Sequence, residues 1–378
     1  MNTPLFYKSK PAFGIDIGQA SIKIVQINTK SKVPTVTGYG YIEFDPSAIV
    51  KGVIVKPEII SSAISKLLGG VIVGKITTER VFASVPIAYA YTRILTLPEL
   101  SKEELTEAVK LEVEQYVPIQ IEDLYIEYER VSSLHNPSKQ DVKANPSLAK
   151  AKPSKKELLE KQTNLILMVA TPKRIVDSYL EIFNQSGFEV AAIEPTMFAN
   201  HRAVNQFSPS ISPRVVIDFG SHSSDLAIYD GFVRLVNTVE TGGAHITEQI
   251  MKTLNVNQEQ ANKVKTHFGI AKSRWQVQLA NGLQPILSDF ANEVQKTMRY
   301  YHEHSPKNAI QDIVMVGGGA NMPGLAEFFT HLTGVKVINY NPWKYLQLES
   351  LQPPYQSETT IYDTAIGLAL NRDNSTND

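Results

Sequence analysis

The chain has 378 residues, of which 43% are hydrophobic and 20% are charged, and its formal net charge at pH 7 is −1. This composition is typical of a globular protein with a sizeable core, and the length favours two or more domains. The small net charge argues against general binding to nucleic acid or to anionic membranes, and the absence of cysteine excludes disulfides and thiolate chemistry. Because no signal segment and no run of about 18 apolar residues occurs, we expect a cytoplasmic protein.

The first motif, close to the start of the chain, is a strand, a glycine turn and a second strand. An apolar run at 13–17 contains Asp16 near its end, and β-branched residues resume at Ile22. Gly18 lets the backbone turn without a Cβ, and the small residues after it offer free N–H groups to an anion. A carboxylate beside such a turn suits Mg²⁺ with phosphate, whereas an ordinary β-hairpin is the alternative.

The next stretch predicts a strand at 36–44 and a helix at 57–68 that Gly69 ends. Residues 69–76 nearly match a phosphate-binding P-loop. However, Ile76 stands where that loop needs a Ser or Thr hydroxyl for Mg²⁺, and a helix rather than a strand precedes it. We therefore exclude a P-loop at this position.

From residue 80 the pattern changes and predicts an additional unit. Its elements are strands at 80–86 and 89–97, a helix that a Ser101–Glu104 capping box opens and Pro118 ends, and a strand at 124–131. Residues 132–161 are rich in Lys, Ser, Pro, Ala and Asn, which predicts a solvated, flexible tongue, with a basic docking site as the alternative. A strand at 164–170 follows, and Thr171 and Pro172 predict the N-cap and first residue of another helix.

A second copy of the first motif follows about 200 residues after it. Its strand at 215–219 carries Asp218, Gly220 makes the turn, and apolar residues resume at Leu226. Another apolar strand at 313–316 leads into three consecutive glycines, Gly317, Gly318 and Gly319. Two Asp-x-Gly hairpins in this order, closed by a strand and a triple glycine, are a much more specific signal than any one of them.

Several elements flank these motifs. A strand delivers Glu194 to the start of a helix, where the helix dipole favours a carboxylate. Gly242 and Gly243 give a second flexible turn before a helix. The apolar spacing at 288–304 predicts an amphipathic helix, and a helix at 363–370 closes the ordered part of the chain.

Together, the two hairpins and the triple glycine resemble the actin, Hsp70 and sugar-kinase ATPase superfamily. The resemblance implies an α/β, actin-like ATPase fold of two related RNase H-like domains with a nucleotide cleft between them. It also implies ATP and Mg²⁺ as ligands, with the metal held by Asp16 and Asp218. The residues that it places at the nucleotide are Asp16, Gly18, Gln19, Ala20, Ser21, Lys23, Gly220, Ser221, Gly242, Gly243, Lys263, Gly317, Gly318, Gly319 and Asn321.

Phosphoryl transfer from ATP depends mainly on charge neutralisation and on an in-line water. In the bacterial actin homologues the element that matches Glu194 and Pro195 orients that water, so the resemblance implies catalytic roles for Glu194 and Asp218. The alternative for Glu194 is a carboxylate that only suits the helix dipole. Gln19 departs from the Ser or Thr often found there, and His222 is bulky for a phosphate loop, so we expect a nucleotide-dependent switch with slow hydrolysis.

The additional unit separates the members of this superfamily. It resembles the extra subdomain of the FtsA and PilM families, which sugar kinases and Hsp70 proteins lack. The details at 14–18 with 21–23, at Leu97 and Pro98, and at 112–119 resemble the PilM family of type IV pilus assembly, over nearly the whole chain. FtsA proteins typically end in an amphipathic membrane-targeting helix, which the polar residues 371–378 cannot form.

The resemblance divides the chain into four parts. These are subdomain 1A at 1–80 and 165–205, the inserted subdomain 1C at 81–164 with its tongue at 132–161, subdomain 2A at 206–243 and 309–378, and subdomain 2B at 244–308.

The function that the resemblance implies is a cytoplasmic, ATP-binding scaffold of the type IV pilus inner-membrane complex. It would bind the N-terminal cytoplasmic peptide of a PilN-type partner in a groove near the extra subdomain, and this partner would hold it at the inner membrane. It would also serve the pilus motor ATPases as a platform; a homo-oligomer stays open, and no nucleic acid is expected. An FtsA-like division filament protein and a sugar-kinase-like phosphotransferase are the alternatives.

Overall fold

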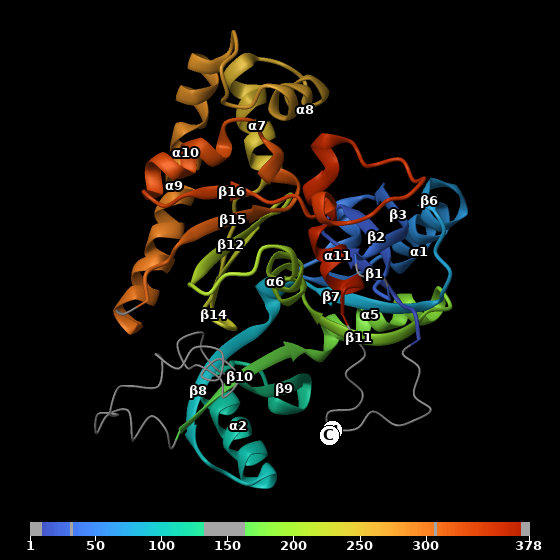
Figure 1. Ribbon diagram of the computed structural model, residues 1–378, viewed down its shortest axis with the longest axis vertical. Coiled ribbons are helices and arrows are strands. Elements are labelled where there is room, and N and C mark those ends of the chain that lie inside the picture. The colour runs from blue at the N-terminus through green and yellow to red at the C-terminus, as the bar shows by residue number, and fades with distance from the viewer. Residues whose placement is uncertain (1–9, 31–32, 132–162, 306–307, 372–378) are drawn as a thin grey trace.

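The computed structural model describes residues 10–30, 33–131, 163–305 and 308–371. Two mixed sheets face each other across two central helices, and a smaller antiparallel sheet lies at one end of the molecule (Figure 1). The predicted tongue at 132–161 lies outside the described residues, as do 306–307 within the predicted subdomain 2B.

The first sheet is built around the first hairpin and has six strands in the order β11-β7-β1-β2-β3-β6. The hairpin strands pair antiparallel with Asp16 opposite Lys23, and the first of them also pairs parallel with β7. The strands are β1 (Phe13–Ile17), β2 (Ser21–Asn28), β3 (Thr35–Glu43), β6 (Val73–Gly74), β7 (Arg80–Val85) and β11 (Glu189–Pro195), with a separate pair β4 (Ile49–Val50) and β5 (Val53–Ile54).

Helices α1 (Pro57–Lys66) and α5 (Lys173–Gln185) cover one face of this sheet. Both are amphipathic, and their buried side chains join those of β1, β2 and β7 in one apolar cluster. The prediction that Gly69 ends the first helix was wrong, because a π-helical turn (Leu67–Val71) continues past it and buries Leu67.

The second sheet repeats this arrangement around the second hairpin, in the order β14-β13-β12-β15-β16. Its hairpin strands pair antiparallel with Asp218 opposite Asp225, and the strand before the triple glycine pairs parallel with β12, as β7 does with β1. The strands are β12 (Arg214–Phe219), β13 (Ser224–Tyr229), β14 (Val233–Val239), β15 (Asp312–Val316) and β16 (Val337–Asn339).

Helices α7 (Gly243–Leu254), α8 (Gln258–His267), α9 (Gln276–His304) and α10 (Leu325–Thr333) complete the second half, and they share one apolar core with that sheet. The amphipathic helix predicted at 288–304 is confirmed, with Phe290 and Val294 buried, but it begins twelve residues earlier, at Gln276. The helix continues through Pro285 because Leu283 and Leu287 are fully buried on either side of it.

Helices α6 (Thr196–Phe207) and α11 (Asp363–Ala369) lie between the two sheets (Figure 1). They pack so closely that a Cβ added to Gly367 would overlap the Ala199 carbonyl. Tyr229 and Tyr340 reach across from the second half and donate their hydroxyls to the α6 carbonyls of Met197 and Ala203. The two halves are therefore joined through two closely packed helices.

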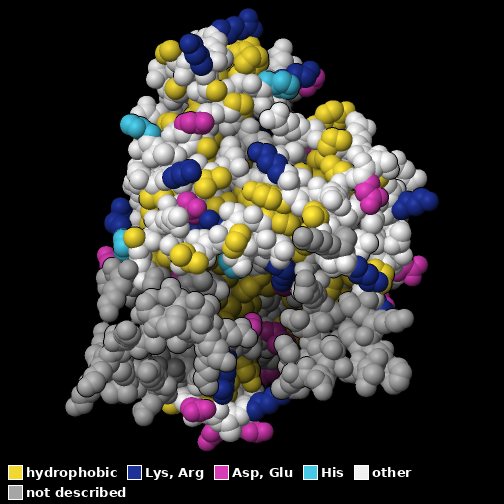
Figure 2. Space-filling view, in the orientation of Figure 1, with side chains coloured by type: hydrophobic (Ala, Val, Ile, Leu, Met, Phe, Trp, Pro, Cys, Tyr) yellow, Lys and Arg dark blue, Asp and Glu magenta, His cyan; other side chains and the backbone are white. Residues whose placement is uncertain are grey.

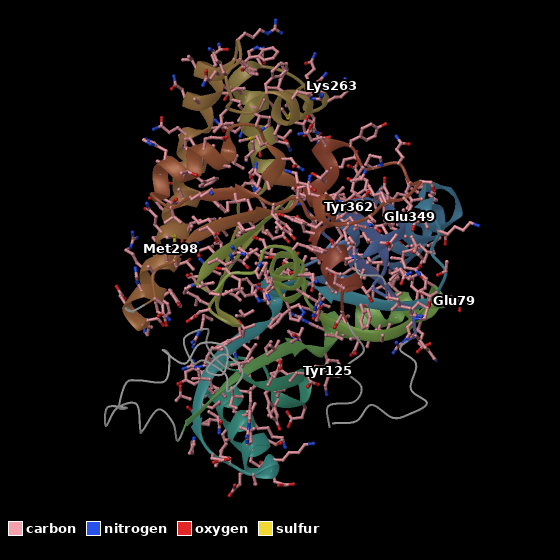
Figure 3. All side chains as sticks on the ribbon, in the orientation of Figure 1. Glu79, Tyr125, Lys263, Met298, Glu349 and Tyr362 are labelled. Atoms are coloured by element: carbon pink, nitrogen blue, oxygen red, sulfur yellow. The ribbon has the colours of Figure 1, made fainter. Side chains whose placement is uncertain are left out.

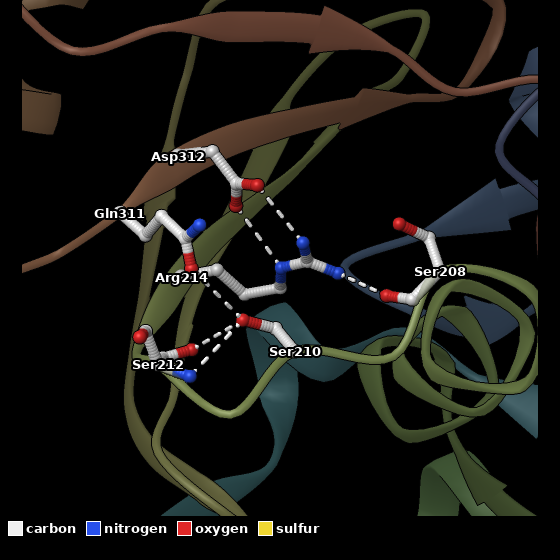
Figure 4. A network of polar contacts seen from close by, with 6 residues as sticks. All are labelled: Ser208, Ser210, Ser212, Arg214, Gln311 and Asp312. Carbon is white, nitrogen blue, oxygen red and sulfur yellow. Dashed lines mark hydrogen bonds and ion pairs between the residues drawn. The ribbon is translucent and has the colours of Figure 1, made fainter.

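A buried ion pair anchors the segment between α6 and the second sheet (Figure 4). Arg214 donates to both oxygens of Asp312, at 3.0 and 2.9 Å, and to the Ser208 carbonyl at 2.6 Å. Ser210 and Gln311 extend this network along the surface. Because both charged side chains are buried, the pair holds the starts of β12 and β15 together.

The additional unit consists of three antiparallel strands in the order β8-β10-β9 and one helix that covers a face of them. Its elements are β8 (Tyr91–Pro98), α2 (Lys102–Tyr116), β9 (Leu124–Val131) and β10 (Thr163–Pro172). The predicted capping box is confirmed, with Ser101 and Glu104 exchanging hydrogen bonds. The predicted N-cap Thr171 is wrong, because Thr171 pairs with Tyr125 in the sheet and α5 begins only at Lys173.

None of the described helices combines the length and apolar character that crossing a bilayer requires. On the face that Figure 2 shows, lysine and arginine side chains are interspersed with acidic ones, and neither sign gathers into a continuous patch.

Candidate functional site

A cavity of about 820 Å³ lies where the two hairpin turns meet. Its walls are the β1–β2 turn on one side and the β12–β13 turn on the other, together with parts of α7 and α8 and the glycine loop after β15. A cavity of this volume is in the range of small-molecule and cofactor sites. The two Asp-x-Gly motifs, far apart in the sequence, therefore share one site.

Both turns leave backbone donors free. The Gly18 N–H donates to the backbone carbonyl of Ser21 at 2.9 Å, and the Gly220 N–H donates to the backbone carbonyl of Asp218 at 3.1 Å. The amides that come next, those of Gln19 and Ala20 in one turn and of Ser221 and His222 in the other, have no hydrogen-bond partner among the described residues. Two sets of unpaired N–H groups in one cavity suit an anionic ligand such as a phosphate chain.

The glycine turn before α7 is fixed to the second hairpin turn. The Gly243 N–H donates to the Gly220 carbonyl at 2.9 Å, and the Ala244 N–H to the Ser221 carbonyl at 2.8 Å. A Cβ at Gly242 would approach the Ser221 carbonyl oxygen within 2.5 Å, which explains the need for glycine there. The α7 terminus therefore supports the turn, and these two amides are not available to a ligand.

The two hairpin carboxylates have different surroundings. Asp16 is buried, accepts from Lys23 Nζ at 3.0 Å and from Ser84 Oγ at 3.0 Å, and is thus already neutralised. Asp218 accepts from Asn200 Nδ2 at 2.8 Å through Oδ2 only. Burial raises the pKa of Asp218, and the Asn200 hydrogen bond opposes that rise.

The cavity is acidic as a whole. Six acidic side chains line it, against two lysines: Asp16, Glu43, Asp218, Asp225, Glu248 and Asp363, with Lys23 and Lys265. Burial raises the pKa of Asp225 to about 7, although a hydrogen bond from Thr238 opposes it. Burial, and then the charge of Asp218, raise the pKa of Asp363 well above its usual range. A phosphate ligand entering this cavity needs cations to accompany it.

Most of the residues that the resemblance placed at the nucleotide line this cavity. They are Asp16, Gly18, Gln19, Ala20, Ser21, Lys23, Asp218, Gly220, Ser221, Gly243, Gly317, Gly318 and Gly319. The Gln19 side chain itself turns aside and donates to the Ile49 carbonyl at 2.8 Å.

Four of those residues do not line it: Glu194, Gly242, Lys263 and Asn321. Lys263 lies on the outer side of α8, paired with Glu259 at 2.7 Å (Figure 3). Asn321 donates to the Ser357 carbonyl at 2.9 Å and to Thr360 Oγ1 at 2.6 Å, so it holds the glycine loop rather than facing the cavity.

Glu194 is engaged away from the cavity. Its two carboxylate oxygens accept from the two terminal nitrogens of Arg202, at 2.6 and 2.7 Å. Arg202 also donates to the Gly367 carbonyl at 2.9 Å, so this ion pair ties the end of β11 and the helix α6 to α11. The neighbouring residue Thr196 does line the cavity.

The sequence analysis missed Lys265, Asn262 and Thr247, which form one connected group at the α7–α8 wall. Lys265 Nζ donates to the Gly243 carbonyl at 3.0 Å and to Thr247 Oγ1 at 2.7 Å, and burial lowers its pKa. No acidic partner of Lys265 exists among the described residues. The signal was present, because Gln258, Asn262 and Lys265 follow the spacing of one helix face, whereas Lys263 does not.

In the described part of the chain, no group of three or more His, Cys, Asp or Glu side chains is arranged to hold a metal ion. The oxygen ligands in the cavity nevertheless suit Mg²⁺, which is usually bound through one or two carboxylates and completes its shell with water and phosphate.

The comparisons with known proteins agree with this geometry. A family model described as type IV pilus assembly protein PilM matches residues 14–373. The chain is 22% identical to the cell division protein FtsA of Enterococcus hirae over 222 residues, a match that covers 54% of this chain and 50% of that protein. Over 180 residues it is 26% identical to FtsA of Neisseria meningitidis serogroup B, covering 40% and 41%. The chain thus spans half or less of these curated relatives.

Among solved structures, a PilM–PilN type IV pilus biogenesis complex contains a chain with a TM-score of 0.75 at 20% identity, with 96% of this chain and 98% of that chain covered. The ethanolamine utilization protein EutJ of Carboxydothermus hydrogenoformans has a TM-score of 0.52 at 14% identity, with 96% and 90% covered. MreB5 of Spiroplasma citri bound to AMPPNP has a TM-score of 0.50 at 11% identity, with 96% and 95% covered.

These likenesses confirm the predicted actin-like fold. The family model extends over nearly all of the chain, including the additional unit between β7 and α5. The chain therefore belongs to the PilM family of type IV pilus assembly proteins.

Proposed function

We propose that the protein binds ATP with Mg²⁺ in the cavity between its two hairpins and serves as a nucleotide-dependent scaffold in type IV pilus assembly. The observation that carries this proposal is the pair of opposed turns, each with unpaired amides and an aspartate, around one cavity. The division into four subdomains belongs to the same proposal, with two shifts at the boundaries given above: β7 pairs within the first sheet, and β10 pairs within the additional unit.

The charge of the cavity supports the divalent cation. With six acidic side chains and two lysines in its lining, the cavity repels a bare triphosphate. Asp16 and Asp218 stand beside the phosphate-binding amides, where Mg²⁺ would offset the phosphate charge. The expected result is that removing Mg²⁺ with EDTA weakens ATP binding at least tenfold, or about 1.4 kcal/mol. This is less than the ~4 kcal/mol of one charge pair about 4 Å apart near a protein surface.

That experiment is a titration of the whole chain with a fluorescent ATP analogue, in Mg²⁺ and in EDTA. Saturable binding in Mg²⁺ and weak binding in EDTA support the proposal. Equal binding in both conditions contradicts the role of the cation, and no binding in either contradicts nucleotide binding.

We infer slow hydrolysis, at most. Fast phosphoryl transfer needs a group that orients the attacking water, and the residue that the resemblance implies for this task, Glu194, has both of its oxygens on Arg202. Rapid ATP turnover by the purified monomer would contradict this inference.

For the partner, we infer the N-terminal cytoplasmic peptide of a PilN-type protein, which would hold this chain at the inner membrane. A solved complex of PilM with PilN supports this inference, because a chain of that complex shares the fold of this chain over nearly its whole length. The additional unit, with its own apolar core, also supports it. Contact with the pilus motor ATPases is part of the same proposal. The FtsA relatives match over only part of their length, so we do not propose a division filament.

Binding of a PilN-type peptide, measured by calorimetry beside a scrambled peptide, tests the partner. We expect at least micromolar affinity for the native order of residues and none for the scrambled one. No binding at high peptide concentration contradicts the proposed partner and leaves the nucleotide site unaffected.

A further inference from the structure

Asp363, the first residue of α11, lies in the lining of the cavity, as Asp218 does. Asn200 links the two, because it accepts from Oγ1 of the next residue, Thr364, at 2.8 Å and donates to Asp218 Oδ2 at 2.8 Å. Asp363 is only 1% exposed, and neither of its carboxylate oxygens accepts a hydrogen bond from any described residue. The Gly317 N–H, which is close enough to favour the charged form of Asp363, donates instead to the Thr360 carbonyl at 3.1 Å. Such a group is rare in a folded protein.

A buried carboxylate without donors has to be neutralised. Burying it as an unpaired charge would be costly, so it holds either a proton or a cation. No lysine, arginine or histidine forms an ion pair with Asp363 among the described residues. The nearby charged group that affects it is a second carboxylate, Asp218, which only increases the need for a positive ion.

Asp218 also has an oxygen to spare. Its Oδ2 accepts from Asn200, but its Oδ1 accepts no hydrogen bond from the described residues and faces Gly317, where any Cβ would overlap it. Asp16 differs, because Lys23 and Ser84 satisfy both of its oxygens. Of the three carboxylates, Asp218 and Asp363 are therefore the two with free oxygens.

We propose that the divalent cation that accompanies the nucleotide binds between Asp218 and Asp363, with phosphate and water oxygens as its remaining ligands. This inference rests on the proposed nucleotide site. It adds Asp363, a residue of α11 that neither hairpin motif contains, as a ligand of the cation. Two hard carboxylate ligands with an incomplete shell fit Mg²⁺ or Mn²⁺, and they explain why no three-residue metal site is found in the described chain.

Binding of Mn²⁺ to the whole chain of 378 residues, followed by electron paramagnetic resonance in the presence of ADP, tests the proposal. Asp363→Asn removes the charge with little change in volume. The matched control is Glu248→Gln, because Glu248 also lines the cavity but pairs with Lys252 at 2.7 Å on the surface of α7. Both variants replace one carboxylate of the lining with an amide.

We expect Asp363→Asn to weaken Mn²⁺ binding at least about tenfold, because losing a direct ligand should cost no less than the roughly 10- to 100-fold that losing an outer-shell partner costs. Glu248→Gln should change it less than about twofold, since exposed pairs contribute little. In EDTA, where Asp363 holds a proton in place of a cation, Asp363→Asn should bind ADP as well as the wild type does, because neither side chain is charged.

Asp363→Ser serves as a second variant, and the melting temperature of each protein in EDTA checks folding. Both Asp363 variants, folded, should lose Mn²⁺ affinity. If either folded variant binds Mn²⁺ as Glu248→Gln does, the proposed ligand is wrong while the nucleotide site stands. If the wild type binds no nucleotide at all, the proposed function fails instead.

Discussion

Gly317 offers a sharp test of how the glycine loop shapes the site. Its backbone has φ 82° and ψ 168°, a conformation that side chains rarely adopt. A Cβ there would overlap Asp218 Oδ1 and would lie 2.8 Å from the Phe219 carbonyl oxygen. Gly318, the next residue, has no such constraint: its added Cβ would come no closer than 3.3 Å, to Ile361 Cγ2.

Gly317→Ala should therefore destabilise the protein and displace the Asp218 carboxylate. The backbone conformation alone costs roughly 1–3 kcal/mol, and the overlap adds to this, so we expect the free energy of unfolding to fall by about 3 kcal/mol. Gly318→Ala is the matched control and should change that free energy by less than about 1 kcal/mol, as an exposed substitution does.

Urea unfolding followed by circular dichroism gives both free energies, and titration with Mg²⁺ and a fluorescent ATP analogue gives the affinities. The Gly317 variant should be the less stable of the two and should lose more affinity than the Gly318 variant does. Equal stability and equal affinity of the two variants would refute the assignment of Gly317 to the wall beside Asp218.

Three further predictions follow from single contacts. Burial, and then the charges of Arg214 and Arg202, lower the pKa of His201 to about 4. The unfolded chain, with a His pKa of about 6.5, therefore binds this proton first, and stability is lost as pH falls from about 6.5 toward 4. His201→Gln should remove about 3 kcal/mol of this pH dependence in urea unfolding, and an unchanged pH profile would contradict the prediction. Asp312→Asn should cost about 3–5 kcal/mol because it leaves Arg214 buried and unpaired, whereas Arg214→Met with Asp312→Leu should cost clearly less; equal losses would mean that the ion pair itself is stabilising. Lys265→Met should weaken nucleotide binding, whereas Lys263→Met, which only removes a surface ion pair, should not. If Lys263→Met weakened binding and Lys265→Met did not, the nucleotide-binding lysine would be Lys263, as predicted from the sequence.

The two hairpins were predictable because they depend on local patterns. An apolar strand, an aspartate and a glycine turn define each one, and the register places Asp16 and Asp218 as expected, at the ends of β1 and β12. The capped helix α2 was predictable for the same reason, since its capping box lies within four residues. The actin-like fold followed from the order of these motifs.

The errors concern side-chain direction and tertiary packing. On α8, only the phase of the helix against α7 separates Lys265, which faces the cavity, from Lys263, which faces outward. Pro285 lies inside α9 because core packing outweighs its local preference.

The surroundings of two acidic residues could not be predicted from the sequence, because they depend on how the helices α6 and α11 pack. Glu194 meets Arg202 on α6, and that pair reaches Gly367 on α11. Asp363 reads as an ordinary helix-opening acid, and only the packing of α11 between the sheets brings it beside Asp218. Contacts of this kind carry no periodic signal.

Nucleotide binding by the two hairpins together is the central claim, and titration of the purified chain with ATP and Mg²⁺ tests it most directly. The wild type is measured beside Asp16→Ala and Asp218→Ala, one from each side of the cavity. We predict saturable binding that both substitutions weaken. Wild-type protein that binds no nucleotide, or variants that bind it as the wild type does, would contradict a shared site between the hairpins.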